Sequence, residues 1–157
     1  MGNIINDFSR QYRYLSNFYK CYIEYKGVVF NTVEAAFQAA KVKTNNNTDM
    51  IEALNAFAKM TPSEAKKAGR KVILREDWEK VKNNIMYELV HFKFTMNQEL
   101  GLKLISTGNA YLIEGNTWHD NYWGSCKCQK CKDKVKANKL GEILMCVREE
   151  LKTQLIY

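Results

Sequence analysis

One short stretch of the chain organises the segments around it: Phe30-Asn31-Thr32-Val33-Glu34-Ala35-Ala36-Phe37-Gln38-Ala39-Ala40-Lys41. Thr32 is a residue type that caps a helix N-terminus, and the alanine-rich run behind it favours a helix that we expect to reach about residue 43. Apolar residues recur along this run at steps of three and four, at Val33, Phe37 and Ala40. This spacing predicts a helix that packs one side against the core.

A second face of the same helix is polar. Glu34, Gln38 and Lys41 recur at positions i, i+4 and i+7, so they share one face. An acid, an amide and a base in a row could line a polar pocket. Alternatively, the face is solvated, and Glu34 only supports the helix through its charge near the N-terminus and a side-chain pair. The pattern alone leaves both interpretations open.

Clear start and stop signals flank this helix. Before it, Lys26-Gly27 predicts the turn of a hairpin. After it, Thr61-Pro62-Ser63-Glu64 combines a capping threonine, a proline at the first helical position and a glutamate at the third, and Gly69 is placed to end that helix. Between the two, either Asn47 or Thr48 can cap a further helix.

Hydrophobic periodicity predicts the remaining elements. Helices are expected over residues 33–43, 49–59, 62–69, 76–96, 99–106 and 140 to about 155, and strands over residues 21–25, 28–30 and 111–113. The predicted fold class is α+β: one mostly helical domain over residues 1–157 with a small β-sheet. A loop rich in lysine and cysteine, at about residues 125–137, is expected as an insertion in this domain.

Length, charge and cysteine content limit the possible classes of protein. The chain has 157 residues, enough for a core of its own, and a formal net charge of +7. This charge excludes an acidic disordered chain and favours an anionic partner. No apolar run is long enough for a membrane helix, and residues 1–6 lack a signal-peptide pattern. Five cysteines cannot all pair, so we expect a reduced, cytoplasmic protein with no membrane partner.

A second polar segment, residues 114–124, combines carboxylates with aromatic rings: Glu114-Gly115-Asn116-Thr117-Trp118-His119-Asp120-Asn121-Tyr122-Trp123-Gly124. A site that stacks a flat base and hydrolyses its bond to a sugar needs a π face, a carboxylate and an exposed loop. Trp123 and Asp120 could supply the first two. Alternatively, the loop seals the core, with Asp120 as a cap and His119 as a hydrogen-bonded structural residue.

Three cysteines follow in the pattern Cys126-x-Cys128-x-x-Cys131. Thiolates at this spacing could hold zinc or another soft metal. A closed site needs a fourth ligand, and no second Cys-x-x-Cys pair exists in the sequence. The candidates for that ligand are His119, Cys146 and Cys21. Alternatively, the three are free surface thiols in a loop.

Taken in order, these pieces resemble the YbiA/NADAR family, a group of N-glycosidases related to NAD and ADP-ribose metabolism. The matches span nearly the whole chain. They are Leu15-Ser16-Asn17-Phe18, Phe30-x-Thr32-Val33-Glu34-x-x-Phe37-Gln38-Ala39-x-Lys41, Ala65-x-x-x-Gly69-Arg70, Arg75-x-x-Trp78-x-x-Val81-Lys82, Met86, Lys93-Phe94, Glu114, Asp120-x-x-Trp123-Gly124 and Asn138-x-Leu140-Gly141. The resemblance implies an α+β, mainly helical fold and a hydrolase that acts on N-glycosyl bonds.

Known substrates of the family imply two possible partners. One is a small phosphorylated nucleoside-like molecule, such as a ribosylaminopyrimidine phosphate of riboflavin synthesis. The other is guanine in nucleic acid that carries ADP-ribose. No metal or redox cofactor is required for either reaction, a structural zinc at the cysteines is an added possibility, and no obligate protein partner is expected.

The resemblance also implies site residues. Breaking the bond from C1′ to nitrogen passes through an oxocarbenium-like state, so one carboxylate should stabilise that charge and activate water while a second group protonates the leaving nitrogen. Glu34 and Asp120 are the predicted catalytic residues, in either order. Trp123 is expected to stack on the base or sugar, and Lys41 and Arg70 to hold phosphate. The other predicted substrate-binding residues are Asn17, Phe18, Gln38, Gly124 and Asn138.

The sequence departs from the family in one place. The family usually has a short glycine-rich loop before Asn-x-Leu-Gly, whereas this chain has the lysine- and cysteine-rich residues 125–137. Six lysines and one aspartate between residues 127 and 139 give a local charge of +5, which could contact phosphate. Two further hypotheses follow: a module that binds ADP-ribose or nucleic acid without hydrolysis, and a zinc-supported nucleic-acid contact added to the enzyme.

Overall fold

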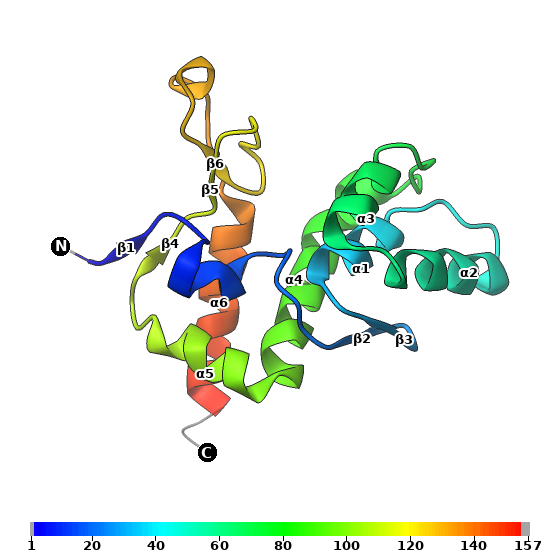
Figure 1. The fold of residues 1–157 in the computed structure, drawn as a ribbon, viewed down its shortest axis with the longest axis horizontal. Helices are drawn as coiled ribbons and strands as arrows, with labels where there is room; N and C mark the ends of the chain where they lie inside the picture. The colour runs from blue at the N-terminus through cyan, green and yellow to red at the C-terminus, as the bar shows by residue number, and fades with distance from the viewer. Residues whose placement is uncertain (1, 155–157) are drawn as a thin grey trace. The chain divides into compact units, whose positions relative to one another are not determined.

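The computed structural model describes residues 2–154, and its elements fall into two units (Figure 1). The central unit comprises residues 17–97. The terminal unit joins residues 2–16 to residues 98–154. Each unit is described by itself below.

A two-stranded hairpin opens the central unit. Strand β2 (Ile23–Tyr25) pairs antiparallel with β3 (Val28–Phe30), with Ile23 opposite Phe30. Lys26 and Gly27 both have positive φ angles, 49° and 78°. Two such residues form the tight turn whose twist matches that of the flanking strands. The predicted hairpin and its turn are confirmed.

Four helices follow the hairpin: α1 (Val33–Ala40), α2 (Asn47–Ala58), α3 (Pro62–Gly69) and α4 (Trp78–Met96). The Thr32 side chain caps α1 by accepting from the N–H of Ala35, and Thr61 and Glu64 form a reciprocal capping box on α3. Both caps confirm the prediction. The cap of α2 is Asn46, one residue before the expected positions, because its extended backbone lets Oδ1 accept from the N–H of Asp49 at 2.9 Å.

Helix α1 is shorter than predicted. It ends at Ala40 rather than near residue 43, because the chain behind it pairs with a distant segment. Val42 forms an antiparallel bridge with Leu74, and the N–H of Lys43 donates to the carbonyl of Ile73 at 2.8 Å. These backbone bonds compete with the helical ones and end the helix.

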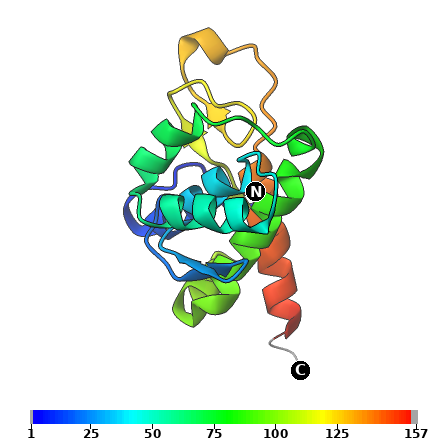
Figure 2. The same ribbon diagram turned by 90° about the vertical axis from the view of Figure 1, so that its right-hand side faces the viewer.

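Helix α1 is the hub of the central unit. All eight of its residues are buried, and it packs against α2, α3, α4 and β3 (Figures 1 and 2). The Phe37 ring lies against Trp78 of α4 with centroids 5.0 Å apart. Small alanine side chains on the remaining surface let the neighbouring helices approach closely. Glu34 and Gln38, the two members of the polar row that lie within α1, are therefore surrounded by protein.

The terminal unit is built around α6 (Lys139–Gln154), which packs on α5 (Gln98–Ser106) and on β4 (Tyr111–Leu112). The predicted end of this helix near residue 155 lies outside the described residues. Strand β1 (Ile4–Ile5) pairs parallel with β4, and β5 (Gly115–Asn116) pairs parallel with β6 (Ser125–Cys126). Two 3₁₀ turns complete the unit, η1 (Arg10–Leu15) and η2 (Gln129–Cys131). Strands of two residues, such as β1, β5 and β6, have no periodicity for a sequence to show.

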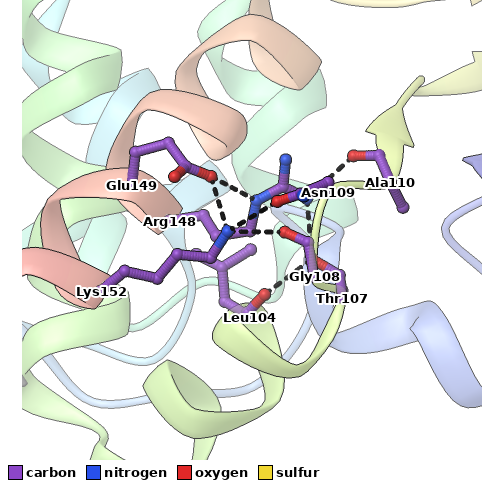
Figure 3. Close-up of polar contacts among 8 residues, drawn as sticks. All are labelled: Leu104, Thr107, Gly108, Asn109, Ala110, Arg148, Glu149 and Lys152. Carbon is purple, nitrogen blue, oxygen red and sulfur yellow. Dashed lines mark hydrogen bonds and ion pairs between the residues drawn. The ribbon is translucent and has the colours of Figure 1, made fainter. Parts of the chain in front are cut away.

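Buried Arg148 ties α6 to the turn that follows α5 (Figure 3). Its Nη1 donates to Thr107 Oγ1 at 2.9 Å and to the carbonyl of Ala110 at 2.8 Å. Nearby, Lys152 Nζ donates to the carbonyl of Gly108 at 2.8 Å. Two cations of α6 thus donate to polar groups of the turn that follows α5.

The α+β, mostly helical class is confirmed. Among residues 2–154, no helix combines the length and the apolar character that crossing a membrane would require.

Lys93 of α4 is a cation in the core of the central unit. Its side chain is buried, with Nζ 5.1 Å from the centroid of the Phe94 ring and 5.7 Å from that of Tyr19. Burial lowers the pKa of Lys93 to about 8, against a smaller opposing effect of Cys21. The two aromatic faces stabilise the charged form only in part.

This burial makes stability depend on pH. Between pH 8 and the ordinary lysine pKa of 10.5, the unfolded chain binds more protons at this position than the folded protein, so stability rises with pH. At about 1.4 kcal/mol per pKa unit, the wild type should gain about 3 kcal/mol relative to Lys93→Met across that window. Urea unfolding of both proteins at pH 7.5 and pH 10 measures the difference. A Lys80→Met control, at an exposed position of α4, should follow the wild type, and parallel curves for Lys93→Met would contradict the account.

Candidate active site

The polar row of α1 forms a buried pair. Glu34 and Gln38 are only 8% and 7% exposed, and Gln38 Nε2 donates to Glu34 Oε1 at 2.7 Å. The interpretation of this face as solvated is therefore wrong for both residues. A carboxylate held this way lies in a low-dielectric environment, where its charge acts more strongly than in water.

The other end of the Gln38 amide is unsatisfied. Gln38 Oε1 is buried and has no hydrogen-bond partner within the described part of the chain. An acceptor left in this state costs about 1–3 kcal/mol, so its persistence is typical of a position that a ligand completes. With Nε2 committed to Glu34, Oε1 is the end of the amide that is left without a donor.

Gly69 provides the room for this amide. A Cβ atom added at Gly69 would lie 1.9 Å from Gln38 Oε1 and 3.0 Å from Lys41 Cε. The last residue of α3 therefore needs to be glycine for the Gln38 side chain to keep its position. The sequence indicated Gly69 as a helix stop and as part of the family motif Ala65-x-x-x-Gly69-Arg70, but not as the space for Gln38.

Two cations accompany the pair. Burial lowers the pKa of Lys41, Glu34 raises it, and Arg70 lowers it further, which places these three charges within electrostatic reach of one another. Lys41 is half-buried, whereas Arg70 at the end of α3 is exposed. Two cations beside one carboxylate leave an excess of positive charge at the surface end of the row, which suits a phosphate group.

Asn17 and Phe18 lie at the start of the central unit. The carbonyl of Asn17 accepts the N–H of Glu34 at 3.1 Å, and its buried side-chain amide lies 3.4 Å from Met86 Sδ. Phe18 is exposed, with Lys66 Nζ 5.6 Å from its ring centroid. Asn17 thus positions the first turn of α1, and Phe18 offers an apolar face to solvent.

The remaining predicted site residues belong to the terminal unit. Asp120 Oδ1 accepts from the N–H groups of Tyr122 at 3.0 Å and Trp123 at 2.9 Å, so this carboxylate oxygen holds its own loop in shape. Trp123 is half-buried, and its ring meets that of Tyr122 edge-on at 4.9 Å. A Cβ atom at Gly124 would lie 2.3 Å from the carbonyl of Glu114, so the loop closes tightly behind Trp123.

Asn138 joins two segments of the terminal unit. Its buried amide accepts from the N–H of Glu114 at 3.0 Å and donates to the carbonyl of Leu112 at 2.9 Å. Both ends of the side chain are engaged with backbone. This geometry gives Asn138 a positioning role for β4 and for the loop that follows it.

The structure therefore groups the predicted residues in two sets. Asn17, Phe18, Glu34, Gln38, Lys41 and Arg70 belong to the central unit, and Asp120, Trp123, Gly124 and Asn138 belong to the terminal unit. In the terminal unit, His119, Cys126, Cys128 and Cys131 also come together, with their ligand atoms all within 4.8 Å of one another. That group could hold a metal ion, and His119 is the one of the three candidate fourth ligands that joins it.

A cavity of about 490 Å³ lies elsewhere in the central unit, lined by Tyr25, Ala40, Met50, Arg75 and neighbouring residues. Its cations are already paired: Arg75 makes two hydrogen bonds to Asp77, at 2.6 and 2.9 Å, and Lys43 lies 2.9 Å from Glu76. Among the residues that line this cavity, no buried carboxylate lies beside an acceptor that lacks a hydrogen-bond partner. The cavity is therefore a weaker candidate for the active site than the polar row on α1.

Comparison with known proteins gives a consistent result. The family model for the NADAR domain matches residues 5–152. N-glycosidase Npun_R5314 from Nostoc punctiforme is 36% identical over 146 residues, which are 92% of this chain and 88% of that protein. N-glycosidase YbiA from Escherichia coli K12 is 34% identical over 152 residues, 94% of this chain and 88% of that protein.

Two further likenesses extend this result. The NMR structure of E. coli YbiA superimposes with a TM-score of 0.80 at 30% identity, covering 99% of this chain and 89% of that one. Riboflavin biosynthesis protein VVA0006 from Vibrio vulnificus is 30% identical over 145 residues, 92% of this chain but 37% of the longer protein. The chain belongs to the NADAR domain family, as the sequence motifs predicted.

The fit of Gly69 against Gln38 can be tested directly. Gly69→Ala should displace the Gln38 amide, shift its side-chain NH₂ signal in an ¹H–¹⁵N spectrum and lower the free energy of unfolding by about 1–3 kcal/mol, because the buried Glu34 carboxylate loses its donor. Lys67→Ala, at an exposed position of α3, should leave that signal in place. An unmoved Gln38 signal in Gly69→Ala would show that the close approach does not constrain the site.

Proposed function

We propose that this protein hydrolyses the N-glycosidic bond between a ribose C1′ and a nitrogen in a phosphorylated substrate. Membership of the NADAR family, whose relatives named above are N-glycosidases, supports the reaction class. The observation that carries the proposal is the buried Glu34 carboxylate, held by Gln38 and flanked by Lys41 and Arg70. A carboxylate at this position repels an anionic ligand, so it adds nothing to binding alone. It therefore gives no support to the alternative of a module that binds its ligand without hydrolysis.

Glu34 is the proposed catalytic carboxylate of the central unit. As the bond from C1′ to nitrogen lengthens, positive charge develops on the sugar, and an ionised carboxylate beside it lowers the energy of that state. The same group can accept a proton from the attacking water, whose oxygen becomes bonded to C1′ while the leaving nitrogen takes up a proton. The hydrogen bond from Gln38 keeps Glu34 oriented for both tasks.

Substrate binding is assigned to the polar atoms around Glu34. The unsatisfied Gln38 Oε1 would accept a hydrogen bond from a ribose hydroxyl. Lys41 and Arg70 would hold the phosphate, and the exposed Phe18 ring would cover the apolar part of the ligand.

Asp120 and Trp123 remain our candidates for the second catalytic group and for base stacking. Asp120 Oδ1 is committed to its own loop, so any transfer of a proton by this residue would use Oδ2. Asp120→Asn keeps the loop contacts through its amide oxygen, which makes it the suitable variant for a separate test of this role.

The substrate class can be resolved by product analysis. We propose a ribosylaminopyrimidine phosphate as the preferred substrate, because one relative is named a riboflavin biosynthesis protein. Purified protein would be incubated with that compound and, in parallel, with guanine-linked ADP-ribose. Release of ribose phosphate from the first is the expected result, release of ADP-ribose from the second would assign the alternative substrate, and tight binding with no product would reject hydrolysis.

Glu34→Gln tests the catalytic assignment. The amide keeps the shape of the side chain but can neither stabilise the developing cation as an anion nor take a proton, so kcat should fall on the order of 10²–10⁴-fold. Glu52→Gln, at an exposed position of the neighbouring α2, is the matched control and should retain wild-type kcat. Steady-state kinetics and thermal melting measure both, and full activity in Glu34→Gln would remove this residue from the mechanism.

A further inference from the structure

We infer that His119, Cys126, Cys128 and Cys131 form a tetrahedral zinc site that fixes the loop carrying Asp120 and Trp123. The inference concerns this chain's lysine- and cysteine-rich segment and stands whether or not the proposed reaction is correct.

The separations of the ligand atoms are close to those in a zinc site. His119 Nδ1 lies 3.2 Å from Cys128 Sγ and 3.4 Å from Cys131 Sγ, and all four ligand atoms lie within 4.8 Å of one another. Zinc bonds of 2.3 Å to sulfur and about 2.0–2.1 Å to nitrogen place tetrahedral neighbours about 3.6–3.8 Å apart. Small adjustments of side-chain rotamers bring the observed group to that geometry.

The backbone is folded to deliver these ligands. Cys128 and Cys131 flank a tight turn closed by a hydrogen bond from the N–H of Cys131 to the carbonyl of Cys128, at 3.0 Å. Cys126 stands at the end of β6, where the Asn121 side chain accepts its N–H at 3.0 Å. His119 has a φ angle of 70°, a left-handed conformation that turns its ring toward the thiols.

Alternative roles for the cysteines explain fewer of these features. Cys126 and Cys131 are fully buried, so the interpretation of the three cysteines as free surface thiols is wrong for these two. A disulfide would use two of the three sulfurs and leave the third, with the imidazole, unexplained. Three thiols and one imidazole that come together in this way form the donor set of Cys₃His structural zinc sites.

The surrounding charge fits such a site. Three thiolates and one Zn²⁺ leave a net charge of −1, since a neutral imidazole adds none. The six lysines and one aspartate between residues 127 and 139 carry a charge of +5, which more than offsets this −1.

The site would lock the loop between its ligands. His119 precedes Asp120, and Cys126 follows Gly124 by two residues, so a metal joining them closes residues 119–126 into a short ring. The 3₁₀ turn η2 is tied to the same point through Cys131. Since the protein fills all four positions, the metal is structural and has no open position for a substrate.

Metal content of variants tests the inference. Wild-type protein, purified under reducing conditions, loaded with zinc and freed of excess metal, should retain about one zinc ion per chain. His119→Asn, which tolerates the left-handed backbone, and Cys128→Ser, at the half-buried ligand, should lose that zinc. Cys146→Ser, at an exposed cysteine of α6, should retain it. Circular dichroism confirms that each variant is folded.

Cobalt substitution provides a readout of geometry. Co²⁺ in the wild type should give the intense visible bands of a tetrahedral thiolate site together with sulfur-to-metal charge transfer, and Cys128→Ser should lose both. Absence of bound zinc in the reduced, loaded wild type would overturn the inference, as would a folded Cys128→Ser or His119→Asn that retains the metal as the wild type does. Activity plays no part in these outcomes, so they are independent of the proposed reaction.

Discussion

The packing of the central unit depends on one constraint, which is that a fully buried helix carries a carboxylate. Every residue of α1 is buried, and Glu34 is among them. Burying such a group unpaired costs several kcal/mol, so the surrounding structure has to offer it a donor and nearby cations. Gln38 supplies the donor, Lys41 and Arg70 supply the charge, and Gly69 leaves the space that the amide occupies.

Local sequence signals predicted the elements of the central unit well. Thr32, the Thr61–Glu64 box and Lys26-Gly27 are caps and turns whose chemistry acts within four residues, so the sequence shows them directly. The early end of α1 could not be predicted, because it depends on pairing with residues 73–75, about thirty positions away. The same limit applies to β1, which pairs with β4 from a distant part of the chain.

Site residues were predictable to different degrees. The spacing of Glu34, Gln38 and Lys41 showed that they share a face, and the family motifs indicated a pocket, but only the packing of α1 shows that the face is buried. Gly69 leaves space for the Gln38 amide, and Asn138 holds two backbone segments together through its side chain. Both roles depend on individual close contacts, which the sequence does not show. The cysteine spacing suggested a metal, whereas the choice of His119 over Cys21 and Cys146 needed the loop to be folded.

We propose that the polar row of Glu34, Gln38 and Lys41 is where the sugar phosphate binds. An ¹H–¹⁵N titration of the protein with ribose 5-phosphate tests it most directly, because the observed amides report location without requiring turnover. We predict that the largest shifts fall on residues 34–41 and 69–70. Shifts confined to the cavity bordered by Tyr25, Met50 and Arg75, with the α1 row unaffected, would contradict the claim.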